Sequence, residues 1–348
     1  MTTKYKNVYI KDVSTIVGPY EFKGPLSKRF DKHYDDMYFG TDSLESAEIQ
    51  LMKDSIDLVL NKSNLKNNDI DLFIAGDLQN QITSSCYTAK DLNIPFLGIY
   101  SACATNTEGL GIGANYIESK ICKNVLVSVS SHNMVSEKQF RNPTEYGAPK
   151  PGTATFTATG GASCILTNKK CKVRIESSTI GIPQDYNQND PMNMGAVMVP
   201  AAANTIYKHL TDLGRTVDDY DLILTGDLGI YGKEILKDFM KKEYNIELKN
   251  YNDCGVMLYD LEEQTDVQAG GSGPVCSPLV VYSDIIKKLE NKELKRVLYV
   301  ATGALFNPSM VFQKNNIISI AHAISLESVE WYTFILFYLQ DLFQCLDN

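Results

Sequence analysis

One local pattern occurs twice in this chain of 348 residues, and it constrains the fold more than any other feature. The segments 67–78 (NNDIDLFIAGDL) and 217–228 (VDDYDLILTGDL) both run from a polar turn through an apolar strand to Gly-Asp-Leu, and Leu222 lies 150 residues after Leu72 (222 − 72). Each segment follows a stretch with helical spacing of apolar residues, at 46–61 and 200–212. The pattern predicts two copies of one folding unit, with chance similarity as the alternative.

A second pair of matching segments favours duplication over chance. The segments 116–132 (YIESKICKNVLVSVSSH) and 288–304 (KLENKELKRVLYVATGA) share a helix end, a Lys-rich turn and a β-branched strand, with Lys120 and Lys292 separated by 172 residues (292 − 120). The offset grows because the second copy holds about twenty additional residues around 241–259. Two copies of helix, strand, helix and strand predict a duplicated α/β unit whose mixed sheets are mainly parallel.

The charge and cysteine content exclude several classes of protein. Lys and Arg number 33 against 42 Asp and Glu, a net charge of −9, and no basic run is long enough for nucleic acid to be a partner. Residues 1–18 hold no apolar stretch of signal-peptide length, which predicts synthesis in the cytoplasm without a signal peptide. The eight cysteines lack zinc-binding spacing, so we expect reduced thiols that lie mostly in the core.

Corresponding loops of a duplicated α/β unit are expected to meet at the carboxyl ends of the strands. This expectation places Asp77 near Asp227, and SACA (101–104) near GPVC (273–276). Cys103 begins a helix there, and free N–H groups at a helix start lower a thiol pKa and bind anions. A nucleophile and a small buried residue are both open interpretations of Cys103. Asp77 and Asp227 are expected to cap helices rather than to hold calcium.

A long polar segment follows the strand that ends at His132. The segment 133–162 begins with Asn133, contains Arg141, Tyr146 and Lys150, and predicts a functional loop, or alternatively a packing arm or dimer contact. The segment 269–277 (AGGSGPVCS) is glycine-rich ahead of a helix and is similar to an anion cradle. It lacks the lysine of a nucleotide-binding P-loop, so no nucleotide is expected.

Together these features resemble the thiolase-like fold of ketoacyl synthases and thiolases, and more closely the stage V sporulation protein AD family. The resemblance covers roughly residues 5–326 and is carried by segments 24–40, 69–81, 130–155, 190–206, 218–228, 269–277 and 297–310. It implies layers in the order α-β-α-β-α. We expect two halves, 1–180 and 181–327, followed by an apolar tail, 328–348.

The resemblance also implies a loss of catalysis. The nucleophile of the thiolase-like enzymes falls on Cys103, and the histidine of chain-initiating ketoacyl synthases falls on the segment 226–228, which is Gly-Asp-Leu here. Their catalytic asparagine falls on 271–273, and the second cysteine of thiolases falls on Thr302. A thiol without a base and oxyanion donors transfers acyl groups slowly, so no catalytic residue is expected. His132 lies in the other half and is discounted as a substitute base.

The family resemblance implies instead a soluble subunit that binds pyridine-2,6-dicarboxylate (dipicolinate) and belongs to a complex that moves it, with calcium, across the spore inner membrane. The expected ligand-binding residues are Cys103, Ala104, His132, Asn133, Arg141, Tyr146, Lys150, Asp227, Gly271, Ser272 and Gly273. No cofactor or metal site is expected, although calcium entering with the ligand is left open. Membrane subunits of the same complex are the expected partners, and a homodimer is expected by analogy. An active cysteine-dependent acyl transferase and a docking subunit with an empty cleft are the alternatives.

The tail is too apolar for a flexible segment. Residues 331–346 include many aromatic side chains and one charge, Asp341, and sixteen residues fall short of the roughly twenty that span a bilayer. The tail is expected to lie in a membrane interface or to dock on another subunit. Packing on its own domain and an artefact of the reading frame are the alternatives.

Overall fold

The computed structural model describes residues 1–140 and 150–329. Within them, twelve strands form one mixed sheet in the order β11-β10-β13-β14-β9-β2-β8-β6-β4-β5, with β1 beside β9 and β3 beside β2. The strands are β1 (Thr2–Lys4), β2 (Tyr9–Val17), β3 (Lys32–His33), β4 (Leu72–Gly76), β5 (Phe96–Gly98), β6 (Asn124–Ser131), β8 (Gly160–Thr167), β9 (Val173–Ile180), β10 (Leu222–Thr225), β11 (Tyr251–Asp253), β13 (Arg296–Leu305) and β14 (Ile318–Ser328). A separate pair joins β7 (Phe156–Thr157) to β12 (Gly271–Ser272).

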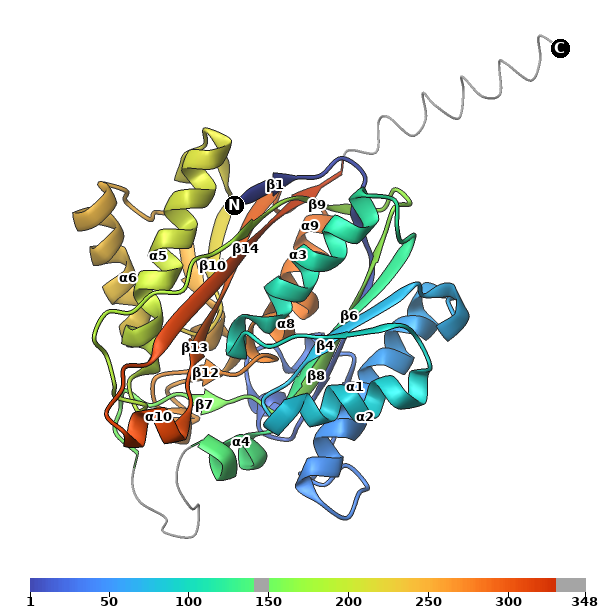
Figure 1. Ribbon diagram of the computed structural model, residues 1–348, viewed down its shortest axis with the longest axis horizontal. Helices are drawn as coiled ribbons and strands as arrows, with labels where there is room; N and C mark the ends of the chain where they lie inside the picture. Colours follow the sequence, from blue (N-terminus) through green and yellow to red (C-terminus); the bar gives the residue numbers. More distant parts are fainter. Residues whose placement is uncertain (141–149, 330–348) are drawn as a thin grey trace, which may run out of the picture.

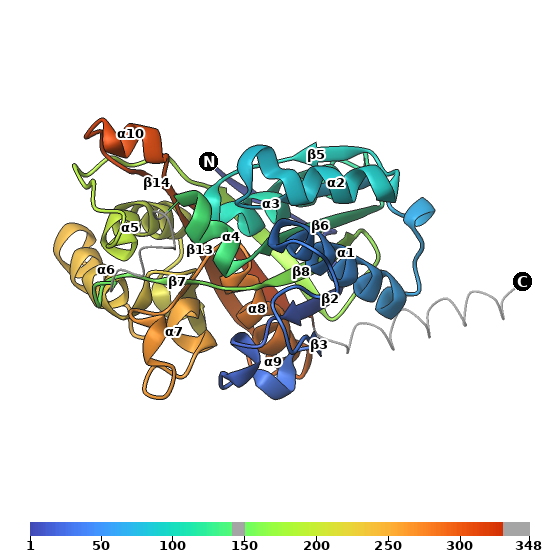
Figure 2. The same ribbon diagram turned by 90° about the horizontal axis from the view of Figure 1, so that it is seen from below.

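The helices lie in three layers (Figures 1 and 2). They are α1 (Leu44–Ser63), α2 (Thr83–Leu92), α3 (Thr105–Glu118), α4 (Asn133–Phe140), α5 (Met194–Leu213), α6 (Gly229–Tyr244), α7 (Cys254–Leu258), α8 (Cys276–Val280), α9 (Ile286–Glu290) and α10 (Pro308–Phe312). Helix α3 contacts strands of both halves of the sheet, α1 and α2 cover β2, β4, β6 and β8, and α5 covers β9, β13 and β14. The chain therefore has the expected α-β-α-β-α arrangement.

The order of the strands confirms the duplication. From the centre outward, one half of the sheet runs β2-β8-β6-β4-β5 and the other runs β9-β14-β13-β10-β11. In each half the two inner pairings are antiparallel and the two outer pairings are parallel. A short antiparallel pairing of β2 with β9 joins the halves. The sheet is mixed, as expected, and its parallel strands are the outer ones.

Two aspartates perform the same task in the two copies. Asp71 Oδ2 accepts hydrogen bonds from the backbone N–H groups of Lys123 (2.6 Å) and Asn124 (2.9 Å) at the start of β6. Asp221 Oδ2 accepts from the N–H groups of Lys295 (2.6 Å) and Arg296 (2.9 Å) at the start of β13. Each carboxylate satisfies two amides that strand pairing leaves open, and so ties the starts of neighbouring strands together.

Two expectations about helices are wrong in detail. Helix α5 begins at Met194, before the expected start at Pro200, so the proline lies inside the helix. Because proline has no N–H group, the carbonyl of Ala196 lacks its usual hydrogen-bond donor. The first part of the expected loop 133–162 forms helix α4. The remainder of that loop includes residues 141–149, which lie outside the described residues.

Helix α3 packs close to the sheet because it is rich in small residues. A Cβ atom on Gly109 would lie 2.8 Å from Val127 Cγ1, and one on Gly113 would lie 2.9 Å from Leu166 Cδ1. The seven cysteines among the described residues are free thiols, and five of them are buried, as expected. Cys345 lies outside the described residues.

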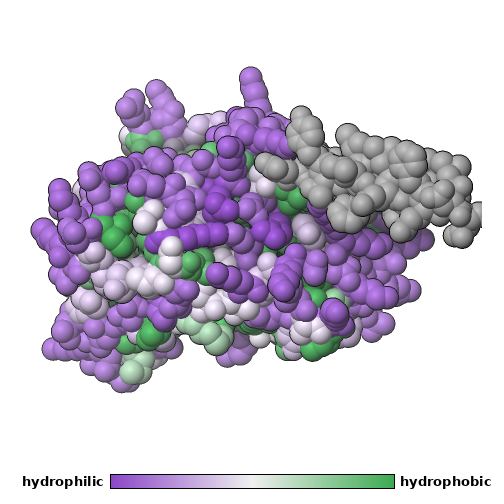
Figure 3. All heavy atoms as spheres, turned by 90° about the horizontal axis from the view of Figure 1, so that it is seen from above, coloured by the Kyte–Doolittle hydropathy of each residue, from purple (hydrophilic) through white to green (hydrophobic). Residues whose placement is uncertain are grey.

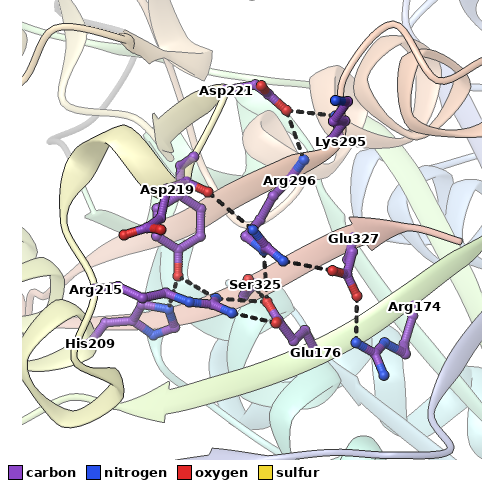
Figure 4. A network of polar contacts seen from close by, with 11 residues as sticks. Arg174, Glu176, His209, Arg215, Asp219, Asp221, Lys295, Arg296, Ser325 and Glu327 are labelled. Carbon is purple, nitrogen blue, oxygen red and sulfur yellow. Dashed lines mark hydrogen bonds and ion pairs between the residues drawn. The ribbon is translucent and has the colours of Figure 1, made fainter.

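A network of charges ties β9, β13 and β14 to the turn after α5 (Figure 4). Glu176 accepts from Arg215 and, at 3.1 Å, from Arg296, while Glu327 bridges Arg296 and Arg174. Burial opposes ionisation of Glu176, but the hydrogen bond from Arg215 and the charges of both arginines outweigh it and lower the pKa of Glu176 to about 2.

Candidate functional site

A small cavity of about 30 Å³ lies at the carboxyl ends of the strands, above Cys103. Its lining residues are Leu78, Tyr100, Ala102, Cys103, Ser136, Phe140, Thr157, Met194, Ser272, Ala304 and Phe306. A wider surface hollow of about 790 Å³ shares Leu78, Tyr100, Phe140 and Phe306 with it. The inner cavity is therefore the floor of a funnel whose walls come from both halves of the fold.

The turn that carries Cys103 is tightly constrained. Cys103 lies in the 3₁₀ turn Ala102–Ala104 between β5 and α3, and Ala102 has a φ of +49°, which is rare for a residue with a Cβ. Strand β13 approaches this turn closely, since a Cβ on Gly303 would lie 2.2 Å from the Ser101 carbonyl oxygen. Glycine at position 303 is thus required for β13 to support the turn.

The structure confirms that segments 101–104 and 273–276 meet. Cys103 Sγ lies 3.9 Å from Ser272 Oγ, and the Asp227 carboxyl group is close enough to raise the pKa of the thiol. Asp227 also accepts from Thr302 Oγ1 at 2.7 Å and from the Gly273 amide at 3.3 Å. Four of the segments that the duplication brings together therefore share one buried polar cluster beneath the cavity.

The expected lowering of the thiol pKa at the start of α3 is wrong. Burial, and next the charge and hydrogen bond of Asp227, raise the pKa of the Cys103 thiol well above its usual range. Burial also raises the pKa of Asp227 to about 7, against the opposing hydrogen bonds from Cys103 and Thr302. Both effects favour the protonated thiol of Cys103, which is the opposite of an activated nucleophile.

The two matched aspartates have different roles. Asp77 accepts from the Gln79 amide (3.0 Å) and from the amide of Ser85 (2.8 Å) in the first turn of α2, as expected for a capping residue. The capping role expected of Asp227 is wrong, because its oxygens accept from the cluster around Cys103. At the start of α6 that role falls to Asp253, which accepts from the Leu228 and Gly229 amides at 2.9 and 3.0 Å.

His132 points away from the cavity. Its Nε2 donates to the Met37 carbonyl at 2.9 Å, and its ring lies edge-on to Phe39, with ring centroids 5.7 Å apart. Asn133 uses its backbone amide to reach Thr159 Oγ1 and its side-chain amide to reach the Thr157 carbonyl. Neither residue belongs to the described lining: His132 Nε2 is bound to the segment around Met37, and both amides of Asn133 are bound to the segment 157–159. The buried Nδ1 of His132 has no hydrogen-bond partner among the described residues.

The other expected site residues are distributed around the cavity. Ser272 lines it, Gly271 and Gly273 flank Ser272, and the fully buried Ala104 immediately precedes α3. Lys150 forms an ion pair of 2.9 Å with Glu137, the neighbour of the lining residue Ser136. Arg141 and Tyr146 lie outside the described residues. The predicted ligand-binding roles of all these residues stay predictions.

The aromatic walls of the cavity and one hydroxyl in it were not predicted from the sequence. Tyr100 directly precedes the turn of Cys103, and Phe140 and Phe306 lie with ring centroids 5.8 Å apart. The hydroxyl of Ser136 is buried and has no hydrogen-bond partner among the described residues. The signal for Phe306 was its position just after the predicted strand of the segment 288–304, whereas Ser136 lies on a helix that was not expected.

Within the described ranges, no three or more His, Cys, Asp and Glu side chains gather to hold a metal ion. None of the helices in the described part of the chain has the length and apolar character needed to cross a bilayer.

Comparison with known proteins identifies the family. The family model for stage V sporulation protein AD (SpoVAD) matches residues 2–327. A stage V sporulation protein AD from Bacillus subtilis (strain 168) is 45% identical over 321 residues, which are 92% of this chain and 94% of that protein. The chain belongs to the SpoVAD family.

Solved structures place this SpoVAD family member in the thiolase-like fold. The 3-oxoacyl-[acyl-carrier-protein] synthase III from Aquifex aeolicus VF5 superposes with a TM-score of 0.58 at 13% identity, covering 92% of this chain and 99% of that chain. OleA from Xanthomonas campestris, in a structure with cerulenin bound, gives 0.59 at 15% identity, covering 93% and 100%. At these identities the likeness concerns the fold, and the activity of the two enzymes does not transfer with it.

Proposed function

We propose that this SpoVAD family member binds dipicolinate without catalysing a reaction on it, as the peripheral subunit of a complex that moves calcium dipicolinate across the spore inner membrane in sporulation and germination. The observation that carries the proposal is the unpartnered hydroxyl of Ser136 in an aromatic cavity. A buried hydroxyl without a hydrogen-bond partner lowers the stability of the folded protein. A ligand oxygen that accepts a hydrogen bond from this hydroxyl would recover that free energy.

The shape and polarity of the funnel suit a flat aromatic dicarboxylate. Tyr100, Phe140 and Phe306 supply ring surfaces at the junction of the cavity and the outer hollow. Ser136, Thr157 and Ser272 supply neutral hydroxyl groups for carboxylate oxygens. Since the inner cavity is small, the ligand ring would lie at this junction, with one carboxylate on the floor.

The charge of the funnel favours the calcium complex over the free dianion. The described residues that line the cavity and the hollow carry neither a Lys nor an Arg side chain, and Asp227 lies directly beneath. Calcium dipicolinate with one ion per ligand is neutral, so it avoids burying uncompensated negative charge. We therefore expect it to bind more tightly than dipicolinate alone.

Isothermal titration calorimetry of the full chain tests the proposal, with dipicolinate titrated alone and with calcium. Ser136→Ala should weaken binding roughly tenfold, the effect of one lost hydrogen bond to a charged group, while Ser119→Ala at the exposed end of α3 should not. Benzene-1,3-dicarboxylate, which lacks the ring nitrogen, is the matched control ligand. Absence of heat with dipicolinate in both forms would refute the proposal and leave the docking subunit with an empty cleft.

The acyl-transferase alternative predicts a different result. Incubation with acyl thioesters would leave an acyl mass on Cys103, and Cys103→Ala would abolish it. The protonated state of Cys103 argues against this alternative, because the thiolate is the attacking species.

We also propose that two copies pair through β5. This strand is the outermost of its half, and the side chains of Leu97 and Tyr100 beside it are 36% and 43% exposed. Such an edge offers unpaired N–H and C=O groups to a second copy. Light scattering should give the mass of a dimer, and Leu97→Lys should give a monomer.

A further inference from the structure

The end of the sheet opposite the cavity is densely basic. Strand β6 begins after Lys123 and β13 begins after Lys295, and these strands run from there toward the cavity. The exposed lysines in the turns and chain ends at this place form what is here named the basic face: Lys4, Lys6, Lys120, Lys123, Lys169, Lys170, Lys172, Lys292 and Lys295. A chain with a net charge of −9 therefore concentrates positive charge at one end.

Backbone hydrogen bonds hold the turns of the basic face together. The Asn168 amide donates to the Lys123 carbonyl at 3.2 Å, which joins the β8–β9 turn to the α3–β6 turn. At the end of β14, Ser328 donates to the Lys295 carbonyl and Val329 donates to the Lys172 carbonyl, both at 2.8 Å. Figure 3 shows the molecule from this end, where its visible surface is mostly hydrophilic.

Three carboxylates near the basic face accept hydrogen bonds from backbone amides. Glu118 accepts from the Lys6 and Asn7 amides at 3.0 Å, and Asp71 and Asp221 accept from the starts of β6 and β13. Glu293 is exposed beside the lysines and accepts from the Asn291 side chain. A hollow of about 250 Å³ between β1, β9 and the end of α5 is lined by Lys4, Lys6, Arg174 and Arg215 and also by Glu176, which pairs with Arg215.

Two more features of this end suit a lipid surface. Ile121, between Lys120 and Lys123, is 70% exposed, as is typical of a side chain that enters an interface. The described chain ends here at Val329, and the sequence continues into the apolar and aromatic segment 331–346. The last described residue before the apolar segment therefore lies at the basic face.

We propose that the basic face binds an anionic phospholipid bilayer, with the cavity directed away from the membrane. The inference deepens the proposed function, because it assigns the surface by which a peripheral subunit meets the membrane. Lysines near an anionic bilayer each strengthen binding, and the effect decays within a Debye length. Figure 1 shows the course of β6 and β13, which begin at the basic face. Because the residues that line the cavity lie at the other ends of these strands, a protein bound this way keeps the funnel open to water.

Flotation of the full chain with vesicles tests this surface. Binding to phosphatidylcholine containing about one third phosphatidylglycerol should exceed binding to pure phosphatidylcholine and should fall as NaCl rises. Replacing Lys123, Lys172 and Lys295 by Gln should weaken binding to the anionic vesicles on the order of 100-fold, about fivefold per lysine. The matched control replaces Lys23, Lys28 and Lys314, which are exposed on other segments, and should bind as the parent does.

Three results would overturn the proposal: equal binding to neutral and anionic vesicles, equal loss in both triple variants, and no binding to vesicles at all. The first would leave the tail as the sole membrane contact, and the last would favour an acidic protein surface as the partner. Calorimetry with dipicolinate in the absence of vesicles tests ligand binding on its own. It therefore distinguishes a failure of membrane binding from a failure of the proposed ligand binding. A circular dichroism melt of both variants confirms that they are folded.

Discussion

Asp227 lies beside the Cys103 thiol in one buried cluster, and the two residues come from different copies of the duplicated unit. Cys103 stands where the thiolase-like enzymes have their nucleophile, and Asp227 stands where chain-initiating ketoacyl synthases have a histidine. Asp227 raises the pKa of the thiol, so it lowers the reactivity of Cys103. Burial strengthens this effect, because it disfavours the charged form of both groups.

Cys103 should react slowly with iodoacetamide at neutral pH. The exposed Cys86 should be alkylated first, with Cys103 on the order of tenfold or more slower, because its thiol is both buried and protonated. Peptide mass spectrometry over time measures both rates. Asp227→Asn should raise the rate at Cys103 by removing the neighbouring charge, whereas Asp218→Asn on the surface should not. Faster labelling of Cys103 than of Cys86 in the parent would contradict the low reactivity expected of the Cys103 thiol.

Asp71 and Asp221 should contribute equally to stability. Replacing either by Ala leaves two backbone amides without their acceptor, so each variant should lose roughly 2 kcal/mol of the free energy of unfolding. Urea denaturation gives the values, with the exposed Asp218→Ala as control. A large loss in one copy and none in the other would mean that the two copies are not equivalent at this position.

Glu21→Gln should reduce the amount by which the free energy of unfolding falls as the pH rises. Burial raises the pKa of Glu21 from 4.5 to about 7, so the folded state binds a proton that the unfolded chain releases. The stabilisation from this proton is complete below about pH 4.5 and is lost as pH rises through about 7. The free energy of unfolding of the parent therefore falls by roughly 3 kcal/mol over this range because of Glu21.

Urea denaturation of parent and variant at about pH 5 and about pH 8 measures this effect. In Glu21→Gln, the hydrogen bonds from Tyr259 and the Thr159 amide keep an oxygen acceptor. Glu263→Gln on the surface is the matched control and should follow the parent. If Glu21→Gln lost as much stability between the two pH values as the parent does, Glu21 would not be the titrating group.

Glu176 should protect the fold against acid. Because the arginines lower its pKa from 4.5 to about 2, its contribution is present above about pH 4.5 and is lost as pH falls toward 2. Glu176→Gln should therefore cost roughly 2 kcal/mol at neutral pH and much less near the acid limit. Acid unfolding followed by circular dichroism compares it with the exposed Glu234→Gln. Equal acid midpoints in all three proteins would exclude this role.

The matching segments of the sequence by themselves determined the duplication, the α/β class and the meeting of residues 101–104 with 273–276. These features follow from local patterns, since apolar periodicity defines helices and strands and equal units place their strand ends alike. Asp71 and Asp221 hold matching positions in the repeat, but their hydrogen bonds to the starts of β6 and β13 were found only in the structure.

Only the tertiary structure decided which side chains reach the cavity and in which charge state. His132 ends a strand beside the site, but Met37 and Phe39, about ninety residues earlier in the chain, take up its ring. The pKa of Cys103 depends on burial and on Asp227, more than a hundred residues away in the chain. Side-chain direction and desolvation are set by segments that are distant in sequence, and for that reason a local pattern does not contain them.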